Sequence, residues 1–323
     1  MRVCITGGLG YLGSKLTEKL VNKGYDVSII DTQLYGVFLK NDMLNKVKLI
    51  KEDLLSFRNG DIQNAIKESD VVIHLAGIVG DPACDLFKGK SIDINVNGTK
   101  NVIRLCEKFN KKLIFASTCS VYGACDKNSI LTEKSKILPL SIYALSKYAC
   151  EGEIKRSKLK NYTIFRMGTL YGLSPRMRFD LVINTFIGKA IFGGNIEIFG
   201  GDQYRPFLHL DDACNFYLRA IEKDIFPNKI FNLGGNNFKI VDVGKEIEKR
   251  LNCKAKVIKE IKDPRNYKVD SYLAIKTFGL TFKKDIPYAI NEIKEAISSK
   301  LISTNVDSNY SNVEWLRKLW TKC

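Results

Sequence analysis

Short apolar runs recur along the first half of the chain, and more polar stretches separate them. The runs occupy residues 2–6, 26–30, 47–50, 70–76, 112–117 and 162–166. Short, near-continuous apolar runs that alternate with helical segments are typical of parallel strands covered on both faces. The pattern therefore predicts an α/β fold built on a doubly wound parallel sheet.

The segments between the runs carry apolar residues at helical spacing. One apolar face consists of Leu12, Leu16, Leu20 and Val21, and another of Ile94, Val102, Ile103, Leu105 and Phe109. After residue 167, glycine and proline become frequent and the alternation becomes irregular. We therefore expect residues 1–166 to form one domain. Residues 167–323 should form mainly a smaller lobe, with segments around 207–240 returning to the first domain. A polar stretch at 303–311 precedes a predicted short helix with two tryptophans, Trp315 and Trp320.

The composition is that of an ordinary globular protein, with 45% hydrophobic and 27% charged residues among 323. No apolar stretch approaches the roughly 18 residues of a membrane span, so we expect no transmembrane helix. The strand-like start, RVCIT, predicts that there is no signal peptide. Nine cysteines without a C-x-x-C pair favour neither a disulfide framework nor a zinc site, and a cytoplasmic location is predicted.

The chain is strongly basic, with 51 Lys and Arg residues, 35 Asp and Glu residues and a formal charge of +16. Such a field favours anionic partners such as nucleotides, nucleic acids or acidic membranes. The lysines are dispersed, however, which is also typical of solvated helix faces. Charge alone leaves the partner open.

The segment TGGLGYLG follows the first predicted strand and opens the first predicted helix. Gly7, Gly10 and Gly13 let the backbone approach a pyrophosphate, which the amides of a helix N-terminus bind. The second strand ends in Asp31, whose carboxylate is suited to accept hydrogen bonds from the adenosine ribose. Neither of the two residues after Asp31 is an arginine that could bind a 2′-phosphate. The spacing predicts an NAD site rather than an NADP site.

The stretch IFASTCSVYG at 114–123 leads from an apolar strand into hydroxylated residues, which either cap the strand or contact a ligand. Tyr143 and Lys147, in YALSK, lie on one face of a predicted helix. A nearby ammonium lowers the pKa of a phenol, which suits proton transfer near neutral pH. Because ligands bind at the carboxyl ends of parallel strands, and Thr118 lies at the tip of this one, one of these hydroxyls is predicted to hydrogen-bond a substrate.

With these motifs in this order, the chain resembles the extended short-chain dehydrogenases/reductases, specifically the NAD-dependent sugar-nucleotide epimerases and dehydratases. The resemblance covers nearly all of residues 1–290. It rests on TGGLGYLG, Asp31, EDL at 52–54, HLAG at 74–77, NVNGT at 95–99, STCSVYG, YALSK and GDQYRPFLHLDD at 201–212. It implies a Rossmann domain that binds NAD, a smaller α/β substrate-binding lobe, a nucleotide-diphosphate sugar as substrate and a homodimer. We also expect no metal and no membrane partner, and a nucleic-acid partner is disfavoured.

The family's roles carry over by position onto three sets of residues. The catalytic set is Thr118, Tyr143 and Lys147. The cofactor-binding set is Gly7, Gly10, Tyr11, Leu12, Gly13, Asp31, Asp53, Leu54, Leu75, Ala76, Gly77, Asn95, Tyr143 and Lys147. The substrate-binding set is Thr118, Cys119, Ser120, Arg176, Arg178, Asn184, Arg205 and Arg265. Arg205 and Arg265 are implied to hold the diphosphate. Arg176 and Arg178 either join them or lie in a solvated loop, and both histidines, His74 and His209, are expected to be structural.

Differences from the family's sequence motifs reduce the number of reactions that the chain is expected to catalyse. The 4,6-dehydratases carry Asp-Glu after the threonine, whereas this chain carries Cys119 and Ser120, so dehydration lacks its acid and base. Decarboxylases of the family use a glutamate at the Ser120 position, and GDP-fucose synthase carries its cysteine one place after Cys119. Cys119 is therefore either a small buried residue or a site residue.

The expected function is oxidation of a hydroxyl, at C4, of a nucleotide-diphosphate sugar by an NAD-dependent epimerase or dehydrogenase. A 4-ketoreductase would use the same residues, and a 4,6-dehydratase is disfavoured. Three stretches resemble a subgroup linked to surface-polysaccharide sugars, which includes a GDP-heptose 4-dehydrogenase: GDPACD (80–85), YGLSPRMRFD (171–180) and KDPRNYKVD (262–270). The rival from another class is a non-catalytic NAD- or RNA-binding member of the fold, suggested by the charge of +16.

Overall fold

The computed structural model describes residues 1–56, 60–124, 129–260, 265–302 and 310–320. Within these residues, the largest element is a parallel sheet of seven strands in the order β11-β7-β5-β4-β1-β2-β3. The strands are β1 (Arg2–Thr6), β2 (Asp26–Ile30), β3 (Val47–Ile50), β4 (Val71–His74), β5 (Lys112–Thr118), β7 (Tyr162–Met167) and β11 (Lys229–Leu233). The chain reverses its direction of winding at β1, which pairs with both β2 and β4. The predicted doubly wound parallel sheet is confirmed.

Alternate residues of these strands face two different cores. In β1, Val3 and Ile5 belong to one core and Cys4 to the other, and all three are buried. Helices α1 (Tyr11–Asn22) and α9 (Leu210–Glu222) contribute to the first core. Helices α3 (Gly60–Glu68), α6 (Gly98–Lys108) and α7 (Ile142–Arg156) contribute to the second. Burial on both faces explains why the strands form near-continuous apolar runs in the sequence.

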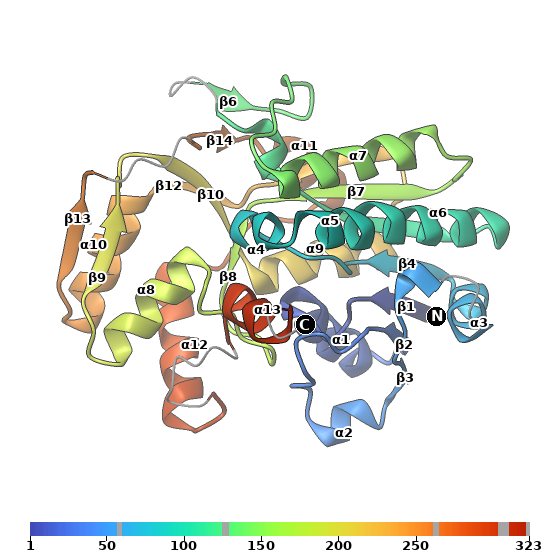
Figure 1. The fold of residues 1–323 in the computed structure, drawn as a ribbon, viewed down its shortest axis with the longest axis horizontal. Helices are drawn as coiled ribbons and strands as arrows, with labels where there is room; N and C mark the ends of the chain where they lie inside the picture. The colour runs from blue at the N-terminus through green and yellow to red at the C-terminus, as the bar shows by residue number, and fades with distance from the viewer. Residues whose placement is uncertain (57–59, 125–128, 261–264, 303–309, 321–323) are drawn as a thin grey trace.

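The remaining strands form smaller sheets. One contains β12 (Asn236–Lys239), β10 (Tyr204–His209) and β8 (Thr169–Tyr171), and the pairs are β13 (Ala255–Ile258) with β9 (Ile196–Phe199) and β14 (Lys268–Val269) with β6 (Ile130–Leu131). Figure 1 shows β9, β13, α8 (Val182–Ile191), α10 (Ile240–Leu251) and α12 (Ile286–Ser298) gathered at the left, away from the large sheet. The division into a domain of 1–166 and a lobe of 167–323 stays a prediction, and β11 and α9 from the later segment complete the large sheet and its helical layer.

The other helical segments are short. They are α2 (Asn41–Leu44), α4 (Asp81–Leu86), α5 (Lys88–Ile92), α11 (Tyr272–Phe278), α13 (Asn312–Trp320), η1 (Leu54–Ser56), η2 (Asp93–Asn97) and η3 (Cys119–Tyr122). Helix α13 is the predicted helix with the two tryptophans, and it packs on α4 (Figure 1). Most of the predicted polar stretch before it, 303–309, lies outside the described residues. None of the described helices is long and apolar enough to cross a membrane.

Candidate active site

A cavity of about 860 Å³ opens along the carboxyl ends of the central strands. This is where open parallel sheets bind ligands, and the volume lies within the usual range of ligand sites. The predicted residues that line it are Gly7, Gly10, Tyr11, Leu12, Gly13, Asp31, Asp53, Leu54, Leu75, Ala76, Gly77, Thr118, Ser120, Tyr143, Lys147, Arg176, Arg178, Arg205 and Arg265. Three predicted site residues, Asn95, Cys119 and Asn184, do not line it.

The glycine loop forms a cradle between β1 and α1. Gly7 has φ +73°, and a Cβ there would lie 2.7 Å from the Cα of Ala76. A Cβ on Gly13 would overlap the carbonyl oxygen of Gly7. Gly10 is the N-cap of α1, and no side chain caps this helix. The first-turn amides of α1 therefore suit an anionic ligand, and the cradle fits the pyrophosphate of a dinucleotide.

Asp31 follows β2 and both shapes a turn and lines the cavity. Its Oδ2 accepts a hydrogen bond from the amide of Leu9 (3.0 Å), and its Oδ1 accepts one from the amide of Gln33 (2.8 Å). Burial raises the pKa of Asp31, while these two hydrogen bonds lower it, and the balance is a raised pKa. The hydrogen bonds by which Asp31 shapes the turn are therefore compatible with its expected role as a ribose ligand.

Asn95 supports the loop after β4 from beneath. Its Oδ1 accepts a hydrogen bond from the amide of Ile78 (2.7 Å), and its Nδ2 donates to the carbonyl of Ile78 (2.9 Å). Gly77 packs so closely above it that a Cβ would lie 2.8 Å from Asn95 Oδ1. Asn95 thus holds the cavity-lining loop and does not itself line the cavity, and its expected contact with the cofactor stays a prediction.

The hydroxyl stretch after β5 divides between cavity and core. Thr118 lines the cavity, and its Oγ1 accepts a hydrogen bond from the amide of Ser120 (3.1 Å). The thiol of Cys119 is fully buried and donates to the carbonyl of Arg166 (3.1 Å). Burial also raises the pKa of the Cys119 thiol. This position favours the small buried residue that the sequence left open, and the expected substrate contact of Cys119 stays a prediction.

Tyr143 and Lys147 lie on α7, which begins at the N-cap Ser141. Burial raises the pKa of Tyr143, and hydrogen bonding to Thr118 partly opposes the rise. Burial also lowers the pKa of the Lys147 ammonium, which lies 4.9 Å from the ring centroid of Phe115. The expectation that Lys147 lowers the phenol pKa in this environment is therefore wrong, because desolvation dominates both groups.

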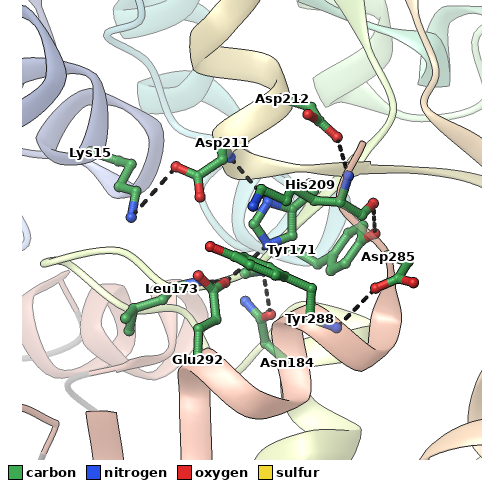
Figure 2. Close-up of polar contacts among 12 residues, drawn as sticks. Lys15, Tyr171, Leu173, Asn184, His209, Asp211, Asp212, Asp285, Tyr288 and Glu292 are labelled. Carbon is green, nitrogen blue, oxygen red and sulfur yellow. Dashed lines mark hydrogen bonds and ion pairs between the residues drawn. The ribbon is translucent and has the colours of Figure 1, made fainter. Parts of the chain in front are cut away.

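Figure 2 shows how a buried network fixes the turn after β8. Glu292 of α12 accepts a hydrogen bond from the amide of Leu173 (2.6 Å), and its carboxylate lies 3.0 Å from His209 Nε2. The other ring nitrogen, Nδ1, accepts a hydrogen bond from the amide of Asp211 (3.2 Å). Nε2 therefore carries the hydrogen and donates it to Glu292. His209 has the position of a structural residue.

The same turn is also held by Asn184 and Tyr11. Asn184 of α8 accepts a hydrogen bond from the amide of Gly172 (3.0 Å) and donates to the Tyr11 hydroxyl (2.9 Å) and the Arg178 carbonyl (2.9 Å). Tyr11 in turn donates to the carbonyl of Gly172 (2.6 Å). Asn184 is fully buried in these contacts, which position the turn, and its expected contact with substrate stays a prediction.

The two arginines after this turn have different surroundings. Arg178 makes two hydrogen bonds to the carboxylate of Asp180 (2.8 and 2.9 Å), and Asp180 also accepts the amide of Asn312 (3.0 Å). Arg176 stacks on Tyr35, with its guanidinium 4.6 Å from the ring centroid. Both arginines are buried and line the cavity, so the solvated-loop alternative is excluded.

Arg205 and Arg265 line the cavity beside the second lobe. The guanidinium of Arg205 lies 5.4 Å from the ring centroid of Tyr267. Arg265 forms an ion pair with Asp81 at the start of α4, and Asp81 also accepts a hydrogen bond from Ser141 (2.7 Å). The sequence motif GDPACD drew attention to Asp81 but not to this ion pair.

Helix α13 supplies a wall that the sequence did not place at the site. Asn312, Val313 and Trp320 line the cavity. The indole Nε1 of Trp315 donates to the carbonyl of Leu34 (2.5 Å), in the loop that follows β2. Two tryptophans in a short polar helix indicate that the helix packs against the rest of the protein. They do not indicate which element it packs against.

Both ring nitrogens of His74 have hydrogen-bond partners inside the core. Its ring nitrogens lie 2.6 Å from Thr6 Oγ1 and 2.8 Å from Thr99 Oγ1, and burial lowers its pKa to about 3. In the part of the chain that the structure describes, no group of three or more His, Cys, Asp or Glu residues could hold a metal ion.

Comparison with known proteins gives consistent results. The model of the NAD-dependent epimerase/dehydratase family matches residues 3–234. A UDP-N-acetyl-alpha-D-glucosaminuronate decarboxylase from Bacillus cytotoxicus is 28% identical, over 97% of this chain and 94% of its own. A UDP-glucuronate 4-epimerase from Thermodesulfobacterium geofontis is 32% identical, over 78% of this chain and 81% of its own. The structure of UDP-glucuronic acid 4-epimerase from Bacillus cereus, in complex with UDP-glucuronic acid and NAD, covers 93% of this chain and all of its own, with 26% identity and a TM-score of 0.80.

Proposed function

Because the chain belongs to the NAD-dependent epimerase/dehydratase family, we propose that it oxidises the C4 hydroxyl of a nucleotide-diphosphate sugar and returns the hydride to the opposite face, as a 4-epimerase. The observation that carries the proposal is that Thr118, Tyr143 and Lys147 line the same cavity as the glycine loop. Two of the similar proteins are 4-epimerases by name, which supports this reaction.

The chain's own residues have distinct roles in this proposal. The phenolate form of Tyr143 accepts the proton of the sugar hydroxyl, and Thr118, oriented by its bond with the amide of Ser120, hydrogen-bonds the reacting oxygen. The ammonium of Lys147 binds ribose hydroxyls of the cofactor, and Asp31 binds those of the adenosine. When bound, NAD supplies the hydride acceptor and, in its oxidised form, a positive charge that favours the phenolate. Arg205 and Arg265 bind the diphosphate of the sugar nucleotide.

Dehydration and decarboxylation have less support. Both reactions use a carboxylic acid after the threonine in the enzymes that this chain resembles, and the chain has Cys119 and Ser120 there. Cys119 is buried away from the cavity, and Ser120 is not an acid. A decarboxylase is among the similar proteins, so a decarboxylation assay belongs in the test.

The test is incubation of the purified protein with a panel of UDP-, GDP- and dTDP-sugars that carry deuterium at C4. A 4-epimerase gives the C4 epimer with deuterium retained and no net NADH. A 4-dehydrogenase gives the 4-keto sugar with one NADH per turnover, and a decarboxylase releases CO₂. Absence of any product across the panel, with NAD bound, would refute the proposal. A role in surface-polysaccharide synthesis, a cytoplasmic location and a homodimer stay predictions.

The rival function, non-catalytic binding of RNA, rests on the charge of +16. Binding through dispersed lysines would be tight, steeply salt-dependent and indifferent to single arginines in the cavity. A titration separates the enzyme proposal from RNA binding. The wild type and Arg265→Ala are titrated with UDP, GDP, dTDP and a single-stranded RNA at two salt concentrations. The enzyme proposal expects selective binding of one nucleotide, weakened about ten-fold or more by Arg265→Ala.

A further inference from the structure

Arg176 is a buried cation that forms no direct ion pair among the residues that the structure describes, although the carboxylate of Asp180 acts on its charge at longer range. It is 1% exposed, and its Nε and Nη2 atoms are buried without a hydrogen-bond partner. Its neighbour Arg178 differs, because the carboxylate of Asp180 binds it at two points. Burying an unpaired guanidinium costs several kcal/mol in general, so an anionic ligand is the expected partner.

The backbone around Arg176 lies directly on the first turn of α1. The hydroxyl of Ser174 donates to the carbonyl of Tyr11 (2.6 Å), and the amide of Arg176 donates to the hydroxyl of Ser14 (3.3 Å). Arg176 therefore enters the cavity beside the helix N-terminus that the glycine loop leaves without a side-chain cap.

The side chain of Arg176 extends from there to the loop after β2. Its guanidinium stacks on Tyr35, four residues after Asp31, and the Tyr35 hydroxyl is also buried without a partner. Burial and the nearby charge of Arg178 lower the pKa of Arg176 to about 10, so it remains protonated at neutral pH. A permanent positive charge thus lies between the expected sites of the pyrophosphate and of the adenosine ribose.

We propose that Arg176 is a cofactor-binding residue whose guanidinium binds an oxygen of the NAD pyrophosphate. This moves Arg176 from the substrate side, where the sequence had suggested it, to the cofactor side. A phosphate or carboxylate of the sugar nucleotide offers the same chemistry, but the contacts of Ser174 and Arg176 with the first turn of α1 favour the NAD pyrophosphate. The inference rests on the NAD site of the proposed function but not on the reaction.

The test compares binding of NAD⁺, ADP-ribose, adenosine and UDP to the wild type, Arg176→Met and Arg176→Lys by calorimetric titration. Arg176→Met keeps the length of the side chain and removes its charge. We expect it to weaken NAD⁺ and ADP-ribose about ten-fold or more and to leave adenosine and UDP unchanged. Arg176→Lys should restore part of the loss. The matched control, Arg205→Met, should weaken UDP and leave NAD⁺ unchanged.

Thermal unfolding separates ligand binding from a structural role. Without added nucleotide, Arg176→Met should unfold at or above the temperature of the wild type, because it removes an unpaired buried charge. The rise in unfolding temperature on adding NAD⁺ should be smaller than in the wild type.

Three results would overturn the inference: unchanged NAD⁺ affinity, a loss confined to UDP or the sugar nucleotide, or a lower unfolding temperature without nucleotide. Wild-type protein that binds no NAD⁺ would refute the proposed function as well, and this separates the two failures.

Discussion

Thr118 and Cys119 are neighbours in the chain, and yet one lines the cavity and the other lies in the core. Successive residues at the end of a strand point to opposite sides, so a shift of one residue exchanges a ligand contact for a packing contact. Tyr143 must approach the same point from α7, and its hydrogen bonding to Thr118 reflects that approach. The chemistry therefore depends on a few side chains that hold the two elements in register.

Replacing Tyr143 with phenylalanine tests the base. The change removes the transferable proton and keeps the ring, so turnover should fall by about 10²–10⁴-fold while substrate affinity changes little. Tyr148→Phe on the same helix is the control, because Tyr148 is exposed and does not line the cavity. Near-normal turnover in Tyr143→Phe would assign the base elsewhere.

The pH profile of turnover follows from the raised pKa of Tyr143. The phenolate is the active form in the oxidation step, so the rate of that step should rise with pH through the neutral range. In Tyr143→Phe this rise should vanish, and a rate that is flat with pH in the wild type would contradict the role. Single-turnover absorbance of NADH measures the step.

The ion pair between Arg265 and Asp81 gives a second prediction for a single residue. If Arg265 binds the diphosphate, it exchanges its carboxylate partner for phosphate, and Asp81 competes with the ligand. Asp81→Asn should therefore tighten nucleotide binding by a few-fold, whereas Arg265→Ala should weaken it. Calorimetric titration with UDP, GDP and dTDP measures both, and weaker binding in Asp81→Asn would show that Asp81 supports the ligand.

Helix α7, which carries the proposed catalytic residues, is fixed to the sheet by a buried ion pair. Glu151 accepts hydrogen bonds from Arg166 Nε (2.9 Å) and Nη2 (2.6 Å) and from the Ser117 hydroxyl (2.6 Å). Arg166 Nη1 donates to the Tyr122 hydroxyl (2.9 Å). The network joins β5, β7, η3 and α7, so it positions Tyr143 and Lys147, and Ser117 is its one member that also lines the cavity.

Breaking this pair should destabilise the whole fold. Glu151→Gln leaves the buried Arg166 without its counter-charge, and removing one partner of a buried pair costs about 3–5 kcal/mol. The control is Glu153→Gln, which removes the exposed pair with Arg156 and should cost less than about 1 kcal/mol. Urea denaturation measures both, and similar values would contradict the role of Glu151.

Elements could be predicted from the sequence where both faces of a strand are buried. The bounds of β1, β2 and β3 agree with the predicted runs, because every residue there packs or pairs. β11 (KIFNL) was not predicted as a strand of the large sheet, because the segments around it lack the regular alternation of strands and helices that marks the first half of the chain.

At the site, the residues that belong to sequence motifs could be predicted. The residues that reach the cavity only through tertiary packing could not. The placement of Tyr35, Asp81 and Trp320 depends on contacts such as that between Leu34 and Trp315, 281 positions apart, which no local pattern records.

At the scale of the whole molecule, many titratable groups are held neutral by burial. Burial raises the pKa of the phenols of Tyr11, Tyr35, Tyr122, Tyr143, Tyr171, Tyr217 and Tyr267 and of the thiols of Cys4, Cys84, Cys106, Cys119, Cys150 and Cys214. Burial lowers the pKa of His74 to about 3. All of these shifts favour the uncharged form in the fold.

The free energy of unfolding should therefore be highest between roughly pH 7 and pH 9. Above this range the unfolded chain loses protons that the folded phenols and thiols keep, so stability falls as pH rises. Below pH 6.5, His74 becomes protonated in the unfolded chain, whereas in the folded protein it stays neutral until about pH 3. The free energy of unfolding therefore falls as the pH drops. Urea denaturation across pH measures both limbs. His74→Asn should make the acid limb shallower, and an unchanged limb would contradict this origin.

The contact of Trp315 with the loop after β2 also orders events during synthesis. The strands that carry the glycine loop and Asp31 leave the ribosome early, whereas Asn312, Val313 and Trp320 are among the later residues to be made. A nascent chain can fold its first strands, but its dinucleotide pocket lacks one wall until α13 arrives. Retention of NAD should therefore appear late in translation, after the sheet itself has formed. The cofactor would then report the arrival of α13 rather than guide early folding.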